Sequence, residues 1–112
     1  MSHFSIQIDH QNSQDVIRVH GEIDLHTCPD LHKTLSEQLA QGASQFVLDL
    51  NQVHYLDSTG LGVIAHAARQ LGEKQGQVHI ITTQPQVLKI FDLSGLTKKN
   101  IIIHANLADV PA

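Results

Sequence analysis

The sequence has 112 residues, which is enough for one small globular domain with a single core. Seven Lys and Arg against 11 Asp and Glu give a net charge of −4, which argues against direct binding of nucleic acid, because such binding needs a basic face. The single cysteine excludes a disulfide framework and fits the reducing cytoplasm. No apolar run reaches the roughly 18 residues of a membrane span, and the polar N-terminus lacks a signal-peptide pattern.

The N-terminal residues predict a β-hairpin. Phe4, Ile6 and Ile8 alternate with polar residues, as in a half-buried strand. The polar residues 10–15 predict a hairpin loop, and the apolar residues of the segment 16–24 predict a second strand.

A helix is expected to follow this hairpin. Thr27 and Asp30 have the spacing of a capping box, and Pro29 suits a first helical turn. Gly42 is placed to end the helix in a left-handed conformation. The apolar residues that recur every four positions and share one helical face are Leu31, Leu35 and Leu39.

The middle of the chain predicts a buried strand, a loop and a second helix. The nearly continuous apolar run 46–50 suits a strand that is covered on both faces, as in a parallel sheet. Residues 51–56 are expected to form a connecting loop. A helix is then expected to begin at Asp57–Gly60 and to end near Gly72, with an apolar side formed by Leu61, Ile64, Ala65, Ala68 and Leu71.

The C-terminal part predicts a strand at 78–81, a short helix from Pro85 that Gly95 closes, a strand at 101–103 and a last helical turn or two at 105–110. Strands that alternate with helices favour right-handed crossovers. The predicted fold class is therefore α/β, with a mixed, mostly parallel sheet, an antiparallel edge strand at the N-terminus and about four helices.

The segment Asp57-Ser58-Thr59-Gly60-Leu61-Gly62 is the strongest candidate for a functional site. A helix cap made by Asp57 or Ser58 accounts for the acid and the hydroxyl, but not for two glycines in the first turns, each of which costs about 0.5–1 kcal/mol relative to alanine. The glycines indicate that something approaches the backbone closely: a strand of the protein itself, a phosphate or a partner surface.

Two enzymatic interpretations of this segment are weaker. Gly60, Gly62 and Ala65 match the spacing of a dinucleotide-binding fingerprint, but the apolar run ends ten residues earlier and no acid stands near residues 80–82. Ser58 as a hydrolase nucleophile would need a base such as His54, and it lacks the expected elbow motif.

The nine histidines are scattered and have no spacing typical of metal ligands. Most are expected to be surface or half-buried side chains, and we predict no metal site, although ligands from distant segments remain an alternative. The histidines are His3, His10, His20, His26, His32, His54, His66, His79 and His104.

A second polar cluster, Gly21-Glu22-Ile23-Asp24-Leu25-His26-Thr27, follows a predicted strand. In a parallel sheet the carboxyl ends of the strands and the next helix N-termini line one edge. Asp24, Asp57 and Ser58 are therefore expected to share one acidic surface.

These two clusters, together with Ile90-Phe91-Asp92-Leu93-Ser94-Gly95-Leu96, resemble the STAS domain, in particular the bacterial anti-sigma factor antagonists. The resemblance covers essentially the whole chain, so residues 1–112 are predicted to be one STAS domain. It implies a partner-switching regulator of transcription in a stress response, which binds an anti-sigma factor with serine kinase activity, is released by phosphorylation and is reset by a PP2C-type phosphatase.

The resemblance also implies the roles of individual residues. Ser58 would be the phosphorylation site, and the partner-binding residues would be Asp24, Thr27, Asp57, Ser58, Thr59, Gly60 and Gly62. No enzymatic activity, cofactor or membrane partner is expected. The alternative is a STAS scaffold or transport-complex subunit that does not act on a sigma factor.

Overall fold

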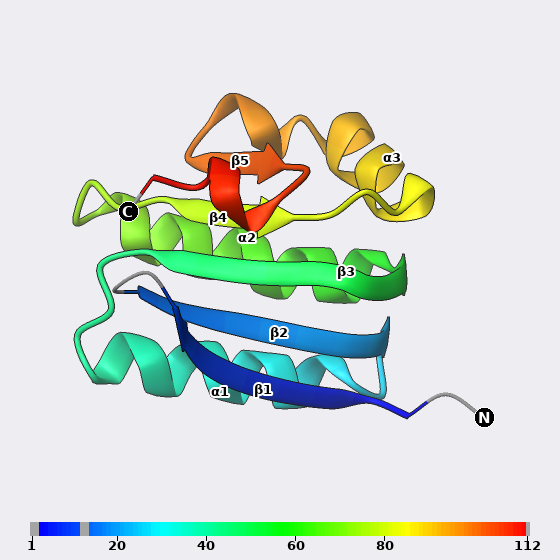
Figure 1. Cartoon of the computed structure of the whole chain (residues 1–112), viewed down its shortest axis with the longest axis horizontal. Coiled ribbons are helices and arrows are strands. Elements are labelled where there is room, and N and C mark those ends of the chain that lie inside the picture. The colour runs from blue at the N-terminus through cyan, green and yellow to red at the C-terminus, as the bar shows by residue number, and fades with distance from the viewer. Residues whose placement is uncertain (1–2, 12–13, 112) are drawn as a thin grey trace.

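In the part of the chain that the structure describes, five strands form one sheet, and their order in space is their order along the sequence (Figure 1). The structure is a computed structural model that describes residues 3–11 and 14–111. The first two strands pair antiparallel and all other neighbours pair parallel, which confirms the predicted sheet. The strands are β1 (Ser5–Gln11), β2 (Gln14–Ile23), β3 (Phe46–Leu56), β4 (Val78–Ile81) and β5 (Ile101–His104).

The predicted hairpin at the N-terminus is formed by β1 and β2, which extend further toward each other than we expected. Gln11 pairs with Gln14, so the strands occupy most of the predicted loop 10–15. Asn12 and Ser13 of that loop lie outside the described residues.

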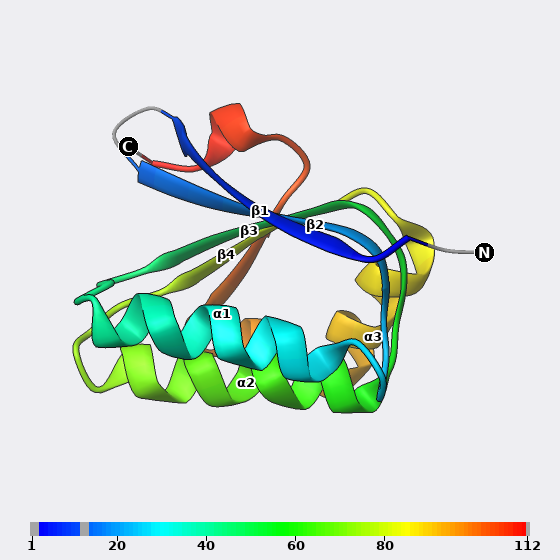
Figure 2. The same ribbon diagram turned by 90° about the horizontal axis from the view of Figure 1, so that it is seen from below.

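Three α-helices accompany the sheet within the described ranges: α1 (Cys28–Ala40), α2 (Ser58–Gly72) and α3 (Pro85–Ser94). Helices α1 and α2 lie side by side on one face of the sheet (Figure 2). The expected fourth helix was wrong, because Leu107–Asp109 form a single 3-10 turn, which is too short to be a stable helix without extensive packing. None of the described helices is both long and apolar enough to cross a membrane.

The main core lies between the sheet and helices α1 and α2. Leu31 and Leu35 of α1 and Ile64 and Leu71 of α2 are fully buried there. Burial of each such side chain stabilises the fold by about 1.5–3 kcal/mol. A smaller cluster on the other sheet face consists of Val16, Val47, Ile81 and Val110.

Strand β3 is longer than its sequence suggested. The expected strand 46–50 continues through the segment 51–56, which we had expected to be a loop. From Leu50, the last residue of the expected strand, the buried residues recur every three positions instead of every two, at Val53 and Leu56, because the pairing of β3 with β2 shifts its register twice. Period-two alternation therefore could not reveal this strand, which leads the chain directly into α2.

Candidate functional site

The loops after β2 and β3 lie next to each other at the carboxyl edge of the sheet. Ile23 and Leu56, the last residues of the two strands, are paired. One residue further, the Asp57 amide donates to the Ile23 carbonyl over 3.0 Å. This confirms that the segments of Asp24 and of Asp57–Ser58 share one edge.

Asp57 is the N-cap of α2. Its Oδ1 accepts from the amides of Thr59 and Gly60, each over 3.0 Å, and from the Thr59 hydroxyl over 2.5 Å. Partial burial raises the pKa of Asp57, but the bonds from Thr59, Gly60 and the Leu25 amide together outweigh burial, so this pKa lies below its usual value. Asp57 is therefore ionised at neutral pH, and the cap is made by Asp57 and not by Ser58.

Ser58 is the first residue of α2, and its side chain is exposed. Among the described residues we find no hydrogen bond to its hydroxyl, whereas the hydroxyl of Thr59 is held by Asp57. A helix N-terminus carries backbone amides without intrahelical partners and favours negative charge. Ser58 thus offers an accessible hydroxyl at a helix end whose backbone amides favour an added negative charge.

Asp24 and Thr27 shape the loop between β2 and α1. Asp24 Oδ1 accepts from the His26 amide over 2.9 Å and from the Thr27 amide over 3.1 Å. Thr27 Oγ1 accepts from the Asp24 amide over 2.9 Å and donates to the Glu22 carbonyl over 2.8 Å. The predicted capping box of Thr27 and Asp30 was wrong, because the Thr27 hydroxyl is bound toward the strand and not toward the helix.

The two glycines of the motif have different surroundings. A Cβ on Gly60 would lie 2.4 Å from Ile23 Cγ2 and 2.7 Å from Leu56 Cδ1, so Gly60 allows α2 to pack onto the ends of β2 and β3. A Cβ on Gly62 would meet no described atom within 4 Å. Internal packing therefore explains Gly60 but not Gly62.

The residues predicted to bind a partner differ in exposure. Ser58, Thr59 and Gly62 are exposed, Asp24, Thr27 and Asp57 are half-buried, and Gly60 is buried. Two apolar side chains near this edge were overlooked: Leu25, 66% exposed, and Tyr55, 43% exposed. Leu25 directly after the turn-forming Asp24 was the available signal, because an apolar side chain in a polar turn has no core to enter.

The geometry bears on the two enzymatic alternatives. The strand before Gly60 was expected to end with the apolar run, ten residues earlier, which is wrong, because β3 continues to Leu56. The space beside Gly60 is nevertheless occupied by Ile23 and Leu56, and no acid stands at the end of β4, which disfavours a dinucleotide. Within the described ranges no hydrogen bond joins Ser58 to a histidine, so no nucleophile–base pair is formed.

Over the ranges 3–11 and 14–111, the histidines form two close pairs and no larger cluster. In the residues that the structure describes, no group of three or more potential metal ligands comes together. The rings of His79 and His104 stack at 5.1 Å, with 2.9 Å between Nδ1 and Nε2, and those of His32 and His66 lie 6.4 Å apart. Burial, and to a lesser degree the charge of His104, lowers the pKa of His79.

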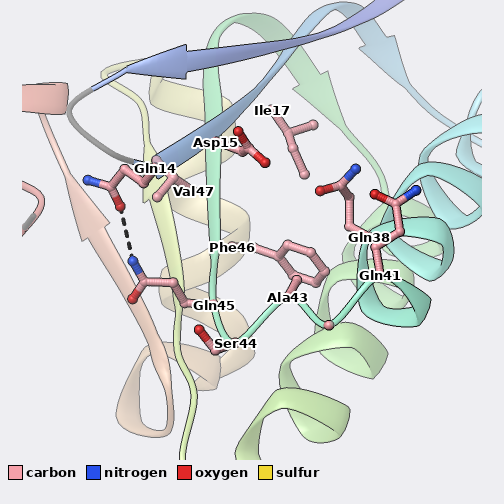
Figure 3. Close-up of a pocket in the computed structure, with 11 residues that line it drawn as sticks. Gln14, Asp15, Ile17, Gln38, Gln41, Ala43, Ser44, Gln45, Phe46 and Val47 are labelled. Carbon is pink, nitrogen blue, oxygen red and sulfur yellow. Dashed lines mark hydrogen bonds between the residues drawn. The ribbon is translucent and has the colours of Figure 1, made fainter.

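A polar hollow of about 310 Å³ lies at the opposite edge of the sheet. Figure 3 shows Asp15, Gln38 and Gln41 around it. The hollow is lined by the start of β2, the end of α1 and the start of β3, whereas Ser58 follows the end of β3. It is therefore separate from the candidate site.

Comparison with known proteins agrees with this geometry. The family model of the STAS domain matches residues 5–110. The chain belongs to the STAS domain family. This STAS domain is 28% identical over 90 residues to the anti-sigma-B factor antagonist of Staphylococcus aureus (strain NCTC 8325), and the alignment covers 80% of this chain and 81% of that protein. It is 30% identical over 94 residues to the anti-sigma F factor antagonist of Paenibacillus polymyxa, and this alignment covers 83% of this chain and 80% of that protein.

Solved structures extend the comparison to the fold. The crystal structure of an anti-sigma factor antagonist from Mycobacterium paratuberculosis has a TM-score of 0.85 and 27% identity, covering 96% of this chain and 90% of that one. The Bacillus cell fate determinant SpoIIAA in its phosphorylated form has a TM-score of 0.70 and 24% identity, covering 91% and 93%. The predicted STAS fold is confirmed, and the relatives place the chain with the anti-sigma factor antagonists.

Proposed function

We propose that this STAS domain acts as an anti-sigma factor antagonist by partner switching in the cytoplasm. Unphosphorylated, it binds an anti-sigma factor that is also a serine kinase, and the sigma factor is freed. The kinase transfers the γ-phosphoryl group of ATP to Ser58 Oγ, the hydroxyl proton leaves, ADP is released and the complex separates. A PP2C-type phosphatase hydrolyses the phosphoserine. The domain itself binds and is modified, and it catalyses no reaction.

The observation that carries this proposal is the exposed hydroxyl of Ser58, to which no described residue forms a hydrogen bond, beside a cap that Asp57 makes without it. Because Ser58 takes no part in capping α2, its oxygen can be phosphorylated without loss of a bond that holds the helix. Thr59 is a poorer acceptor of the phosphoryl group, since its hydroxyl already donates a hydrogen bond to Asp57 over 2.5 Å.

The expected effect of the phosphate is electrostatic. It adds about −1.5 to −2 charges, and the end of α2 compensates by about 0.3–1 kcal/mol. The Asp57 carboxylate opposes it, since two unit charges about 6 Å apart repel by about 3 kcal/mol at an effective dielectric constant of about 20. If the partner presents a carboxylate to this edge, a similar repulsion between that carboxylate and the phosphate would weaken binding more than about a hundredfold. Such a loss is sufficient for a switch.

The proposed partner surface consists of the carboxyl edge and the adjoining exposed side of α2. Asp24, Asp57 and Ser58 supply its polar part, and the open space at Gly62 would let a partner approach the helix backbone. Leu25 and Tyr55 add exposed apolar area near the same edge.

The test compares wild type, Ser58→Ala and Ser58→Asp for affinity to the anti-sigma partner, thermal stability and kinase-dependent mass gain. Ser58→Ala should fold, bind the partner and gain no phosphate, whereas Ser58→Asp should fold but bind more weakly. Wild-type-like binding by Ser58→Asp, together with no mass gain at Ser58 in the wild type, would overturn the switch. A pull-down that instead recovers a membrane transporter subunit would favour the scaffold alternative.

A further inference from the structure

Strand β3 continues beyond the end of β4, and the segment that enters α3 covers its outer edge there. The last pair between these strands joins Asp49 to Ile81, but β3 continues to Leu56. Beyond that pair, Asn51 is held by the next segment of the chain: its Oδ1 accepts from the Thr83 amide over 3.0 Å, and its carbonyl accepts from Gln84 Nε2 over 2.9 Å. Polar side chains thus take the place of a neighbouring strand.

Gln86, in the first turn of α3, makes the contact of this kind that is nearest to Ser58. Its Oε1 accepts from the Leu56 amide, and its Nε2 donates to the Leu56 carbonyl, both over 2.8 Å. One side-chain amide therefore bonds both backbone groups of Leu56, as a residue of an adjacent strand would. Leu56 is fully buried, so its peptide groups have no ready replacement in water if Gln86 is removed.

We propose that Gln86 is the positioning residue of the Ser58 site, because its amide fixes the Leu56 peptide groups from which Asp57 and Ser58 continue. The proposal rests on the proposed function for its kinetic consequence. On the other side of the chain, the Asp57 amide is held by the Ile23 carbonyl over 3.0 Å.

The two residues before Ser58 are thus held from opposite sides, Leu56 by α3 and Asp57 by β2. Loss of the two bonds from Gln86 to Leu56 would let the Asp57 carboxylate move relative to the amides that it caps. It would also widen the range of orientations of Ser58. Misplacement of a reacting group by about 1 Å can slow a reaction by about a hundredfold.

The experiment uses Gln86→Met, which removes both hydrogen bonds and keeps the length of the side chain. Gln84→Met is the matched control, because Gln84 is also half-buried and also bonds the β3 backbone, but at Asn51. With the purified cognate kinase, Gln86→Met should lower kcat for phosphorylation of Ser58 by about tenfold or more with KM changed by less than about threefold, and Gln84→Met should stay within about twofold.

A second measurement needs no kinase. In an NMR titration, the pKa of Asp57 should rise toward its usual value in Gln86→Met and stay unchanged in Gln84→Met. If Gln86→Met does not fold, Gln86→Glu replaces it in the kinase assay, since it keeps the acceptor for the Leu56 amide and loses the donor to the Leu56 carbonyl. Its readout is kcat alone, because the added carboxylate would itself raise the pKa of Asp57 by repulsion.

Equal kcat and equal Asp57 pKa in the two methionine variants would overturn the role of Gln86. If no kinase phosphorylates the wild type but the pKa of Asp57 still depends on Gln86, the positioning role is supported and the proposed function is not. The two failures are therefore distinguishable.

Discussion

Gly60 and Gly62 lie two positions apart in α2, and the structure predicts opposite effects when each is replaced by alanine. Gly62→Ala places a methyl group where no described atom lies within 4 Å. Gly60→Ala places one 2.4 Å from Ile23 Cγ2 and 2.7 Å from Leu56 Cδ1. Both neighbours are fully buried and have little room to move away.

The magnitudes follow from these contacts. Removal of the backbone freedom of a helical glycine stabilises by about 0.5–1 kcal/mol, so Gly62→Ala should raise the free energy of unfolding by that amount. Gly60→Ala has the same gain but also forces extra volume into a packed site, which costs about 1–3 kcal/mol. Its contact distances lie far below van der Waals separation, so the cost belongs in the upper part of that range and the net loss is about 1–2 kcal/mol.

Thermal and urea denaturation of the two variants and the wild type measure this difference. At about 4 °C per kcal/mol for a domain of this size, Gly62→Ala should melt about 2–4 °C above the wild type and Gly60→Ala about 4–8 °C below it. If the partner docks on α2 as proposed, Gly62→Ala should also bind the partner more weakly although it is more stable. Equal melting temperatures for the two variants would refute the assignment of Gly60 to internal packing.

Three further outcomes are expected. Asp57→Asn should change stability by less than about 0.5 kcal/mol, because Asn caps a helix about as well as Asp, but it should slow phosphorylation of Ser58 by the cognate kinase; equal rates would remove Asp57 from the site. Because the pKa of His79 is lower in the folded protein than in the unfolded chain, stability should fall as the pH drops through about 6.5. Denaturation midpoints at about pH 7.5 and about pH 5.5 should therefore differ less in His79→Gln than in the wild type, and an unchanged pH dependence would contradict this. Chelator treatment should leave the melting temperature unchanged, and a drop of several degrees that zinc restores would show a metal site.

The sequence by itself determined the elements whose signals are local. The apolar run Val78–Ile81 forms the expected buried strand. Gly42 adopts the expected left-handed conformation, with φ of 93°, and Gly95 closes α3 as expected, with φ of 73°. These features depend on the preferences of neighbouring residues: a continuous apolar run needs cover on both faces, and a positive φ is easiest for a residue without Cβ. The common edge of Asp24 and Ser58 was also predictable, because parallel strands end on the same side of a sheet.

The tertiary structure alone decided how the site is held. Residue types do not specify whether Asp57 or Ser58 caps α2, or whether the Thr27 hydroxyl bonds to helix α1 or to strand β2, because both depend on angles and distances. Gly60 and Gly62 look equivalent in the sequence, but only Gly60 lies against the ends of β2 and β3. Gln86 reaches Leu56 across 30 positions of sequence. Contacts between distant segments follow from the packing of whole elements, and a register shift or a change of helix position by a few ångströms would give these same side chains different partners.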